Sequence, residues 1–295
     1  MRFFIGLDGG GTGCRAQAEL DDGRRTQIVA GGAANVHSDM ERALITISET
    51  LSAVASMAYD LCPDTQSVAP RVVLGLAGAS ETDAADCLRT ALAVEELTVL
   101  GDVNIAVKGA FRDEDGIVMA IGTGSVLARQ RGGVFHRLGG YGFSLGDEGS
   151  GAWIGREALR RSLHARDGLG PDGPLVQHLW QRFGTTAGFI GFAGKARPAD
   201  YASLAPDVLR FDRAHCPVSA AILDEGCAYL LSAIRALQAG VWDMPVAATG
   251  GLGPFMLDRI TAQGGAHLCR VSPQGTALDG ALWHARTDLA AKEAL

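Results

Sequence analysis

Short apolar runs recur along the chain, and many of them end in glycine. The first run covers residues 3–7, and after a glycine-rich stretch comes a segment, residues 14–20, in which apolar and polar residues alternate. Alternation with a period of two predicts a half-buried β-strand rather than the start of a helix. We therefore expect residues 3–20 to form a β-hairpin.

The same pattern returns about a hundred residues later, which indicates an internal repeat. An apolar strand is expected over residues 116–121, then a Gly-Thr-Gly tip, an alternating strand over 126–130 and a return strand over 134–138. The first copy has its own Gly-Thr-Gly tip and a return strand expected over 25–29. Two such hairpins indicate a duplicated domain whose halves hold one phosphate chain from opposite sides.

Helical periodicity and further apolar runs fill the rest of the chain. A capping box from Ser38 to Glu41 predicts the start of the first helix. The other expected strands cover residues 72–76, 97–100, 246–249 and 268–271. Helices are expected over 80–94, about 218–237 and 275–286, with one ending at 111, one ending at about 164 and one beginning at 250–253. Residues 165–215 are expected to form a mostly helical insert, with helices over 175–183 and 204–211. Strands that alternate with helices, combined with hairpins, predict an α/β fold with mixed sheets.

Composition excludes several kinds of function. The net charge of −7 argues against nucleic-acid binding, which needs a basic face. No stretch is expected to span a membrane, and the first apolar run is too short for a signal sequence, so we expect a cytoplasmic protein. The six cysteines are scattered without a Cys-x-x-Cys pair, which favours reduced, buried thiols over a metal or redox site.

The first glycine loop is suited to binding phosphate. Gly10, Gly11 and Gly13 let backbone N–H groups approach an anion without interference from a Cβ atom, and Thr12 adds a hydroxyl donor. Asp8, at the end of the preceding strand, can hold Mg²⁺ through water. The loop fits neither the Walker lysine motif nor the dinucleotide fingerprint. A plain tight turn, with Asp8 as a turn former, is the structural alternative.

Five segments in order resemble the actin-like ATPase and sugar-kinase superfamily, in particular its N-acetylglucosamine kinases and BadF/BcrA-type ATPases. They are residues 8–15, 121–125, 146–150, 248–253 and 275–281. The resemblance implies two ribonuclease-H-like domains, residues 1–112 with a C-terminal helix 274–290, and residues 113–273. It further implies ATP with Mg²⁺ in an interdomain cleft, and we expect a homodimer.

The resemblance also implies roles for individual residues. Asp102 resembles the catalytic base, and Asn35 resembles a contact to the substrate amide or hydroxyl. The remaining implied positions are a sugar-binding floor and nucleotide contacts, namely Gly124, Gly140, Tyr141, Gly142 and Asp147 for the sugar, and Gly122, Thr123, Gly250 and Gly251 for ATP. Tyr141 stands where animal members have tryptophan, so the sugar preference does not carry over.

Each of these residues has a purely structural alternative. Asp102 could serve only as a helix N-cap, and Asp147 could likewise cap the next helix or offset its dipole. Asn35 could be a turn former, and Gly250-Gly251 could be simple helix-entry glycines. These alternatives are open at the level of the sequence.

The sequence thus predicts an ATP-dependent kinase of an amino sugar, most plausibly N-acetylglucosamine giving the 6-phosphate, with glucosamine as the alternative substrate. Two other classes remain: an ATPase activator of a radical dehydratase, and a sugar- or nucleotide-sensing module without turnover. The activator needs paired cysteines for an iron–sulfur cluster, which the spacing does not offer. The zinc-containing repressor and kinase branch is disfavoured because its Cys-x-Cys-Gly cluster is absent.

Overall fold

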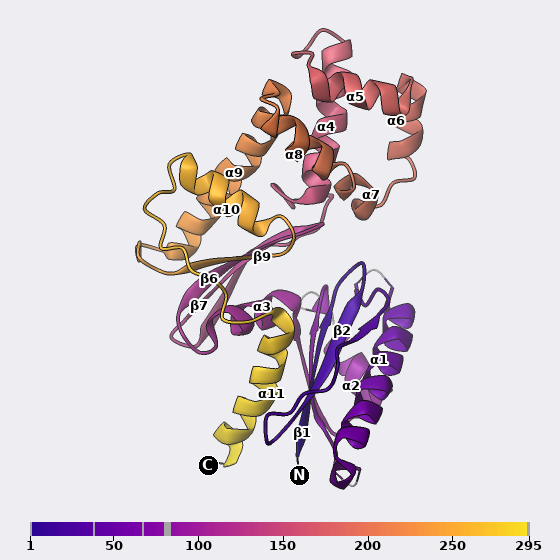
Figure 1. Ribbon diagram of the computed structural model, residues 1–295, viewed down its shortest axis with the longest axis vertical. Helices are drawn as coiled ribbons and strands as arrows, with labels where there is room; N and C mark the ends of the chain where they lie inside the picture. Colours follow the sequence, from indigo (N-terminus) through magenta and orange to yellow (C-terminus); the bar gives the residue numbers. More distant parts are fainter. Residues whose placement is uncertain (1, 38, 67, 80–83, 294–295) are drawn as a thin grey trace. The chain divides into compact units, whose positions relative to one another are not determined.

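The computed structural model describes residues 2–37, 39–66, 68–79 and 84–293 (Figure 1). The chain forms two compact units. Unit 1 contains residues 1–118, 130–135 and 272–295, and unit 2 contains residues 119–129 and 136–271.

Unit 1 is built on a five-stranded mixed sheet with the strand order β3-β2-β1-β4-β5. Strands β1 and β2 form the expected antiparallel hairpin, β3 adds to it antiparallel, and β4 and β5 run parallel to β1. The strands are β1 (Phe3–Gly9), β2 (Cys14–Leu20), β3 (Val29–Gly31), β4 (Arg71–Leu76) and β5 (Glu96–Gly101). The carboxyl ends of the three parallel strands therefore meet at one edge of the sheet.

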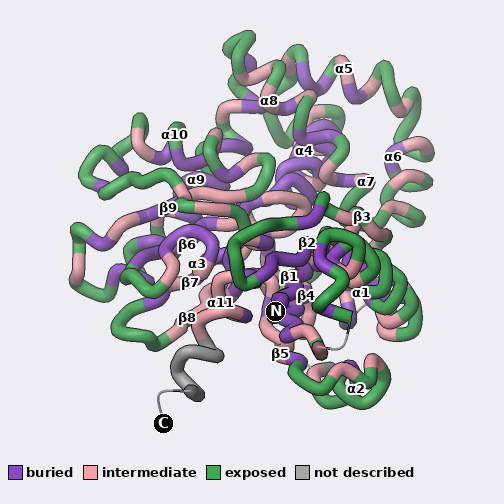
Figure 2. The backbone as a smooth tube through the Cα atoms, turned by 60° about the horizontal axis from the view of Figure 1, so that its bottom comes forward, coloured by how far each residue is buried: buried purple, intermediate pink, exposed green. Residues whose placement is uncertain are grey.

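Helices cover both faces of this sheet (Figure 1). Helices α1 (Met40–Leu61) and α2 (Ala84–Leu92) pack on one face, and a short 3₁₀ helix, η1 (Pro63–Thr65), follows α1. Helices α3 (Asp102–Phe111) and α11 (Ala277–Glu293) pack on the other face. Side chains of β1 alternate between the two cores, and Figure 2 shows the central strands buried.

The sheet associated with unit 2 has the order β8-β7-β6-β9, which repeats the order of the first four strands of unit 1. Its strands are β6 (Gly116–Ile121), β7 (Ser125–Arg131), β8 (Val134–Gly139) and β9 (Val246–Thr249). The repeat predicted from the two glycine-tipped hairpins is therefore present in the strand order of both sheets.

Between β8 and β9 the chain forms six helices among the described residues, and a seventh follows β9. They are α4 (Gly151–Arg166), α5 (Pro174–Phe183), α6 (Thr186–Ala193), α7 (Pro198–Ala202), α8 (Ala205–Arg213), α9 (Pro217–Gln238) and α10 (Gly253–Ala262). The expected helical insert over 165–215 is confirmed.

Two predicted strands are wrong in extent. The return strand expected over 25–29 is reduced to β3, and Arg25 makes only an isolated bridge to Glu19. The strand expected over 268–271 is likewise reduced to a single bridge between Val246 and Arg270. Of residues 268–271 only the first is buried, so this segment has no face to pack as a strand.

The start of α1 also differs from the prediction. Asp39 is the N-cap residue, and its side chain accepts a hydrogen bond of 3.0 Å from the backbone N–H of Arg42. Ser38, the cap expected from the sequence, and residues 80–83, where the second helix was expected to begin, lie outside the described residues.

Helix α9 corrects the expectation that no stretch could span a membrane. Its length and composition pass that test, but half of the relevant window is buried inside the protein. The helix contacts α4, α8 and α10, and its buried face carries Ile222, Leu223, Leu230 and Ile234. Core helices commonly have this character, because a helix buried on several sides must be apolar.

Candidate active site

The turn between β1 and β2 has the geometry expected of a phosphate-binding loop. The N–H of Gly10 donates a hydrogen bond of 2.9 Å to the carbonyl oxygen of Gly13 and closes the loop. Gly11 and Thr12 at its tip are exposed, and an added Cβ at Gly11 would meet no atom within 4 Å. Gly11 is therefore free of packing constraints, which leaves the space above the tip of the loop open to a ligand.

Asp8 is the last residue but one of β1 and is paired with Arg15 of β2 in the hairpin register. A guanidinium nitrogen of Arg15, Nη2, donates to Oδ2 of Asp8 at 2.8 Å. No sequence motif marks this partner of Asp8. The antiparallel register of a hairpin would have indicated the pairing, because residues directly opposite each other share a face of the sheet.

The donor atoms near the loop fit a metal ion carried by a nucleotide. Among the described residues no group of three or more His, Cys, Asp or Glu side chains is placed to hold a metal. Asp8 alone would supply one carboxylate. Mg²⁺ commonly binds proteins through one or two carboxylates and takes its other ligands from phosphates and water, so the residues fit Mg²⁺ held together with ATP.

Asp102 lies at the same edge of the unit 1 sheet as this loop. The register pairs Gly9 of β1 with Leu76 of β4, and Leu76 with Gly101 of β5. Strands are spaced by 4.7–4.9 Å, so the ends of β1 and β5 are about 10 Å apart. The carboxyl ends of parallel strands are the usual location of ligand chemistry in α/β proteins.

The alternative that Asp102 is only the N-cap of α3 is wrong, because the cap lies one residue earlier. Gly101 is the N-cap of α3, and Asp102 is the first helical residue. One carboxylate oxygen of Asp102, Oδ1, accepts a hydrogen bond of 2.8 Å from the N–H of Val103. The half-buried side chain thus sits at the positive end of a helix and at the sheet edge where a substrate would be bound.

Asn35 lies on a segment that is hydrogen-bonded to the ends of two central strands. Ala34 N–H donates to the carbonyl of Gly10 at 3.0 Å, and Val36 N–H donates to the carbonyl of Ala77 at 3.3 Å. Oδ1 of Asn35 accepts a bond of 3.0 Å from the N–H of His37, so Asn35 does shape a turn. The structure therefore brings Asn35, Asp8 and Asp102 to one edge of unit 1.

The second glycine loop, in unit 2, is closed in the same way. The N–H of Gly122 donates to the carbonyl oxygen of Gly124 at 2.9 Å. The first two amides of α4 bind this loop, because Gly151 N–H donates to Gly122 and Ala152 N–H donates to Thr123. An added Cβ at Gly122 would meet open space. The loop is thus fixed from below by α4 and open above.

Asp147 is buried beside the second loop. Its side chain is 8% exposed, and its Oδ1 accepts a bond of 3.3 Å from the N–H of Ser125. A Cβ added at Gly124 would lie 2.9 Å from Oδ2 of Asp147, so only glycine leaves this carboxylate its space. The capping alternative is wrong, because Ser150 is the N-cap of α4 and its Oγ accepts from Trp153 N–H.

Asp147→Asn is expected to stabilise the fold in neutral solution. Burial raises the pKa of the Asp147 carboxyl above its ordinary value of 3.8; the Ser125 N–H opposes that shift and the charge of Glu148 adds to it. A carboxyl with a raised pKa binds more protons when folded, so the free energy of unfolding falls as the pH rises above 3.8. Asparagine removes this charge, and it also tolerates the φ of +64° at this position. Thermal unfolding should give a higher Tm for the variant at pH 8, with the difference shrinking towards pH 4.

Asp113→Asn is a control for which the opposite change in Tm is expected. The Lys108 ammonium donates to Asp113 at 2.8 Å and holds the pKa of Asp113 below its ordinary value. Such a carboxylate contributes stability above its unfolded pKa, so its loss should lower the Tm at pH 8 by a small amount. A lower Tm for Asp147→Asn at pH 8 would contradict the inferred cost of burying its charge.

The predicted sugar-floor residues Gly140, Tyr141 and Gly142 follow β8. Both glycines have positive φ angles, +73° and +84°, which are unfavourable for other residues. Tyr141 is 66% exposed, and the Arg137 guanidinium lies 5.9 Å from the centroid of its ring. The turn therefore presents an exposed aromatic ring on unit 2.

Sequence reasoning missed Tyr229 of α9, which lies close to these residues. A Cβ added at Gly139 would be 3.5 Å from its hydroxyl oxygen. Burial raises the pKa of Tyr229, and the carboxylates of Glu148 and Asp147 are among the groups that add to this shift. No local motif marks Tyr229, because it reaches the turn only through the packing of α9.

The two glycines after β9 have different roles. Gly250 has a φ of +79°, and an added Cβ would overlap the carbonyl oxygen of Ile121, which accepts a bond of 3.0 Å from Leu252 N–H. Gly251 is exposed, and an added Cβ there would meet nothing within 4 Å. Gly250 is therefore required by the backbone of unit 2, whereas Gly251 is free for a ligand contact.

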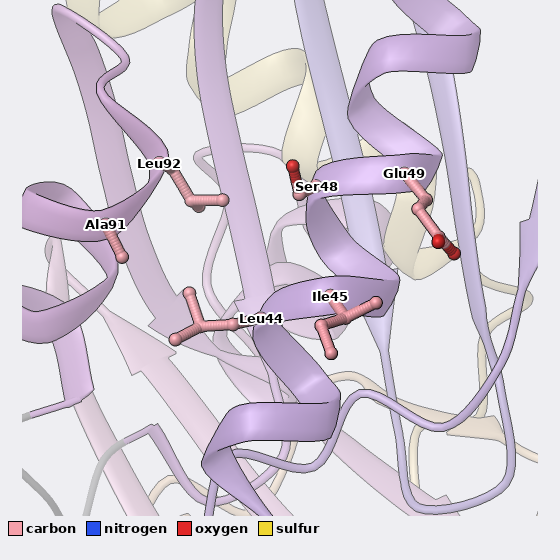
Figure 3. A pocket seen from close by; sticks show the side chains of 6 residues that line it. All are labelled: Leu44, Ile45, Ser48, Glu49, Ala91 and Leu92. Atoms are coloured by element: carbon pink, nitrogen blue, oxygen red, sulfur yellow. The ribbon is translucent and has the colours of Figure 1, made fainter.

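A separate cavity of about 330 Å³ lies between α1 and α2 (Figure 3). It is lined by Leu44, Ile45, Ser48, Glu49, Ala91 and Leu92. None of the predicted site residues lines it, and its lining is mainly aliphatic. It lacks the convergent polar groups that phosphate or sugar binding requires.

Comparison with known proteins identifies several related sugar kinases. The chain is 31% identical over 218 residues, 73% of each chain, to the glucosamine kinase of Vibrio cholerae. It is 31% identical over 198 residues to the N-acetyl-D-glucosamine kinase of Dictyostelium discoideum, covering 62% of this chain and 61% of that enzyme. The crystal structure of a candidate N-acetylglucosamine kinase from Chromobacterium violaceum has a TM-score of 0.84 and 31% identity, covering 97% of this chain and 99% of that one.

The strand order and flanking helices of the two units agree with the similarity to these sugar kinases. The BadF/BadG/BcrA/BcrD ATPase family matches the chain over residues 5–266. The chain therefore belongs to the BadF/BadG/BcrA/BcrD ATPase family and has the two-domain ribonuclease-H-like fold predicted from its sequence.

Proposed function

We propose that this protein is an ATP-dependent kinase that phosphorylates an amino sugar. The observation that carries the proposal is the common sheet edge in unit 1, where the phosphate loop, Asp8, Asn35 and Asp102 come together. Phosphoryl transfer requires the protein to position a donor and an acceptor and to neutralise charge. A phosphate-binding loop at the same sheet edge as a carboxylate that can act as the base meets that requirement.

In this proposal Asp102 is the general base. Its carboxylate accepts the proton of the sugar hydroxyl as the hydroxyl oxygen bonds to the γ-phosphorus, and the bond from that phosphorus to the bridging oxygen of ADP breaks. Asn35 in unit 1 and Asp147 in unit 2 hold the sugar, together with the turn at Gly140–Gly142 and Gly124. Mg²⁺ bound with ATP at Asp8 would neutralise charge on the phosphates.

The nucleotide contacts are proposed to come from three glycine-containing segments. Gly10, Gly11, Thr12 and Gly13 in unit 1 and Gly122 and Thr123 in unit 2 present backbone and hydroxyl donors to the phosphates. Gly250 and Gly251 are proposed to contact the adenosine, and the space beside Gly251 supports a contact there. We further propose domain boundaries at residues 112 and 273, with helix 274–290 returned to the first domain, a cytoplasmic location and a homodimer.

N-acetylglucosamine, giving the 6-phosphate, is the proposed substrate, and glucosamine is the second candidate. The Dictyostelium relative and the Chromobacterium structure support the first. The second is favoured by the Vibrio relative, whose match extends over more residues. Both sugars are compatible with the same fold, because they differ only in whether the amino nitrogen carries an acetyl group.

A panel of hexoses and amino sugars tests this function. With ATP and Mg²⁺, at least one of N-acetylglucosamine and glucosamine should raise the rate of ADP release at least tenfold above the sugar-free background, because only an accepted hydroxyl completes the transfer. ADP release is measured in a coupled assay, and the product is identified by mass spectrometry as a sugar phosphate. Glucose serves as the control that lacks the nitrogen. A rate equal to background for all sugars would overturn the kinase proposal.

The other two functional classes predict different results. An ATPase activator would release ADP without sugar and would need cysteines grouped for an iron–sulfur cluster. In the described part of the chain, four cysteines are buried, and the two exposed ones, Cys87 and Cys269, belong to different units. A sensing module would bind sugar or nucleotide without turnover. The candidate base Asp102 favours transfer of the phosphoryl group to a sugar over both alternatives.

A further inference from the structure

The ion pair between Arg15 and Asp8 lies at the mouth of the first phosphate loop. The two residues are directly opposite each other in the hairpin, and the guanidinium-to-carboxylate distance is 2.8 Å. The Arg15 side chain is 54% exposed and that of Asp8 is 19% exposed. The pair is therefore accessible from solvent, in contrast to the buried side chains of Cys14 and Ala16 on either side of Arg15.

A carboxylate beside a phosphate-binding loop needs a neighbouring positive charge. Asp8 comes two residues before Gly10, and its negative charge would repel the phosphates of a nucleotide. The described residues offer no preformed metal cluster at Asp8, so a metal ion would come only with the nucleotide. In the structure Arg15 supplies the positive charge.

The pair is also weak enough to be exchanged. Ion pairs at the surface contribute little to stability, because water and salt screen them and the side chains lose freedom on pairing. Arg15 thus neutralises Asp8 without locking it, and the carboxylate can change partner at little cost. A brace of the hairpin would not need an exposed pair, because the β1–β2 ladder and its buried face already hold the two strands.

We propose that Arg15 is a positioning residue that neutralises Asp8 until the carboxylate binds the Mg²⁺ arriving with the nucleotide. The inference rests on the proposed nucleotide site. Arg15 and the metal ion then compete for the carboxylate of Asp8. Arg15 therefore sets how strongly nucleotide binding depends on Mg²⁺, and it permits some binding of the metal-free nucleotide.

Calorimetric titration with the non-hydrolysable β,γ-imido analogue of ATP tests the proposal without sugar. The measured quantity is the Mg²⁺ dependence, defined as the Kd in EDTA divided by the Kd in MgCl₂. In Arg15→Gln the metal-free analogue meets a bare carboxylate, while the metal-bound analogue meets no competitor. The Mg²⁺ dependence should therefore rise at least tenfold above that of the wild type, with little change in Tm.

Three further variants serve as controls. Arg15→Lys keeps the positive charge and should keep the Mg²⁺ dependence within about threefold of the wild-type value. Arg24→Gln loses a pair of the same length, 2.8 Å to Asp22, at the other end of β2, and should leave the Mg²⁺ dependence unchanged. In an Asp8→Asn background, adding Arg15→Gln should change the Mg²⁺ dependence less than twofold, because the two residues act as a unit.

The outcomes separate this inference from the proposed function. An Arg15→Gln protein whose Mg²⁺ dependence lies within twofold of the wild type overturns the role of Arg15, and a lowered Tm would then identify a structural brace. A wild type that binds the analogue but phosphorylates no sugar overturns only the kinase proposal. A wild type that binds no analogue in either buffer overturns both.

Discussion

Asp102→Asn is expected to lower kcat for the amino sugar by a factor on the order of 10² or more, the usual contribution of a general base. Asparagine has the same size, and its side-chain oxygen can accept the hydrogen bond that Asp102 accepts from the N–H of Val103. It cannot take up the hydroxyl proton. The Tm and the Kd for the ATP analogue should therefore stay close to the wild-type values.

Asp86→Asn is the matched control for this substitution. Asp86 is an exposed carboxylate in the first turn of α2, paired with Arg89 at 2.8 Å and absent from the proposed site. Its replacement should leave kcat unchanged. If Asp102→Asn turned over sugar at nearly the wild-type rate, Asp102 would not be the base, and Asp147 would be the next carboxylate to test.

Gly250→Ala is expected to destabilise the protein by about 2–5 kcal/mol, the sum of left-handed backbone strain and overpacking. The φ of +79° disfavours any Cβ, and the added methyl group would overlap the Ile121 carbonyl oxygen at the end of β6. Moving β6 would disturb the second glycine loop that follows it. Chemical denaturation measures the loss as a lower midpoint, and ATP-analogue binding should weaken in the same variant.

Gly251→Ala is the neighbouring control. No atom lies within 4 Å of its added Cβ, so the free energy of unfolding should change by less than about 0.5 kcal/mol, as for ordinary surface substitutions. Only a ligand contact would make this alanine weaken nucleotide binding. Equal stability of the two alanine variants would contradict the requirement for glycine at position 250.

The hairpins and the order of elements were predictable because their signals are local. Residues 3–20 combine an apolar run, a glycine tip and an alternating segment, and the antiparallel register of β1 and β2 confirms the hairpin. The repeat made the second hairpin equally clear. The wrong strand at 268–271 shows the limit of such signals, since a short apolar run does not reveal whether its side chains will be buried; beyond Leu268 this segment is exposed, although it lies beside β9.

Within the insert, the helices predicted over 175–183 and 204–211 correspond to α5 and α8, but α6 and α7 were missed. Both are short, and α6 carries glycine at positions 188 and 191, which weakens any helical signal. Aromatic packing holds α6 in place instead, with the ring centroid of Phe189 4.6 Å from that of Trp180 and 4.9 Å from that of Phe183. Tertiary contacts of this kind leave no periodic pattern in the sequence.

The candidate site likewise contains residues that the sequence marks and residues that only the structure reveals. The glycine loops and Asp102 follow strands and were visible as motifs, whereas the Arg15 partner of Asp8 depends on register and Tyr229 depends on the packing of α9. The structure also excludes the N-cap alternative for Asp147 and Asp102, because Ser150 and Gly101 occupy the N-cap positions. The catalytic and binding roles of these residues stay predictions until the variants are measured.

The packing of α11 has a consequence for synthesis on the ribosome. Ala281, Leu282 and Ala285 of this helix bury Phe4 and Val73, on a face of the first sheet whose strands are made first. Since chains emerge from the amino end, the part of that face that α11 covers stays open while all of unit 2 is translated, and only α3 is available to pack beside it. The first unit to be made is thus the last to be completed, and a nascent chain that stops before α11 exposes an apolar sheet face open to aggregation or chaperone binding.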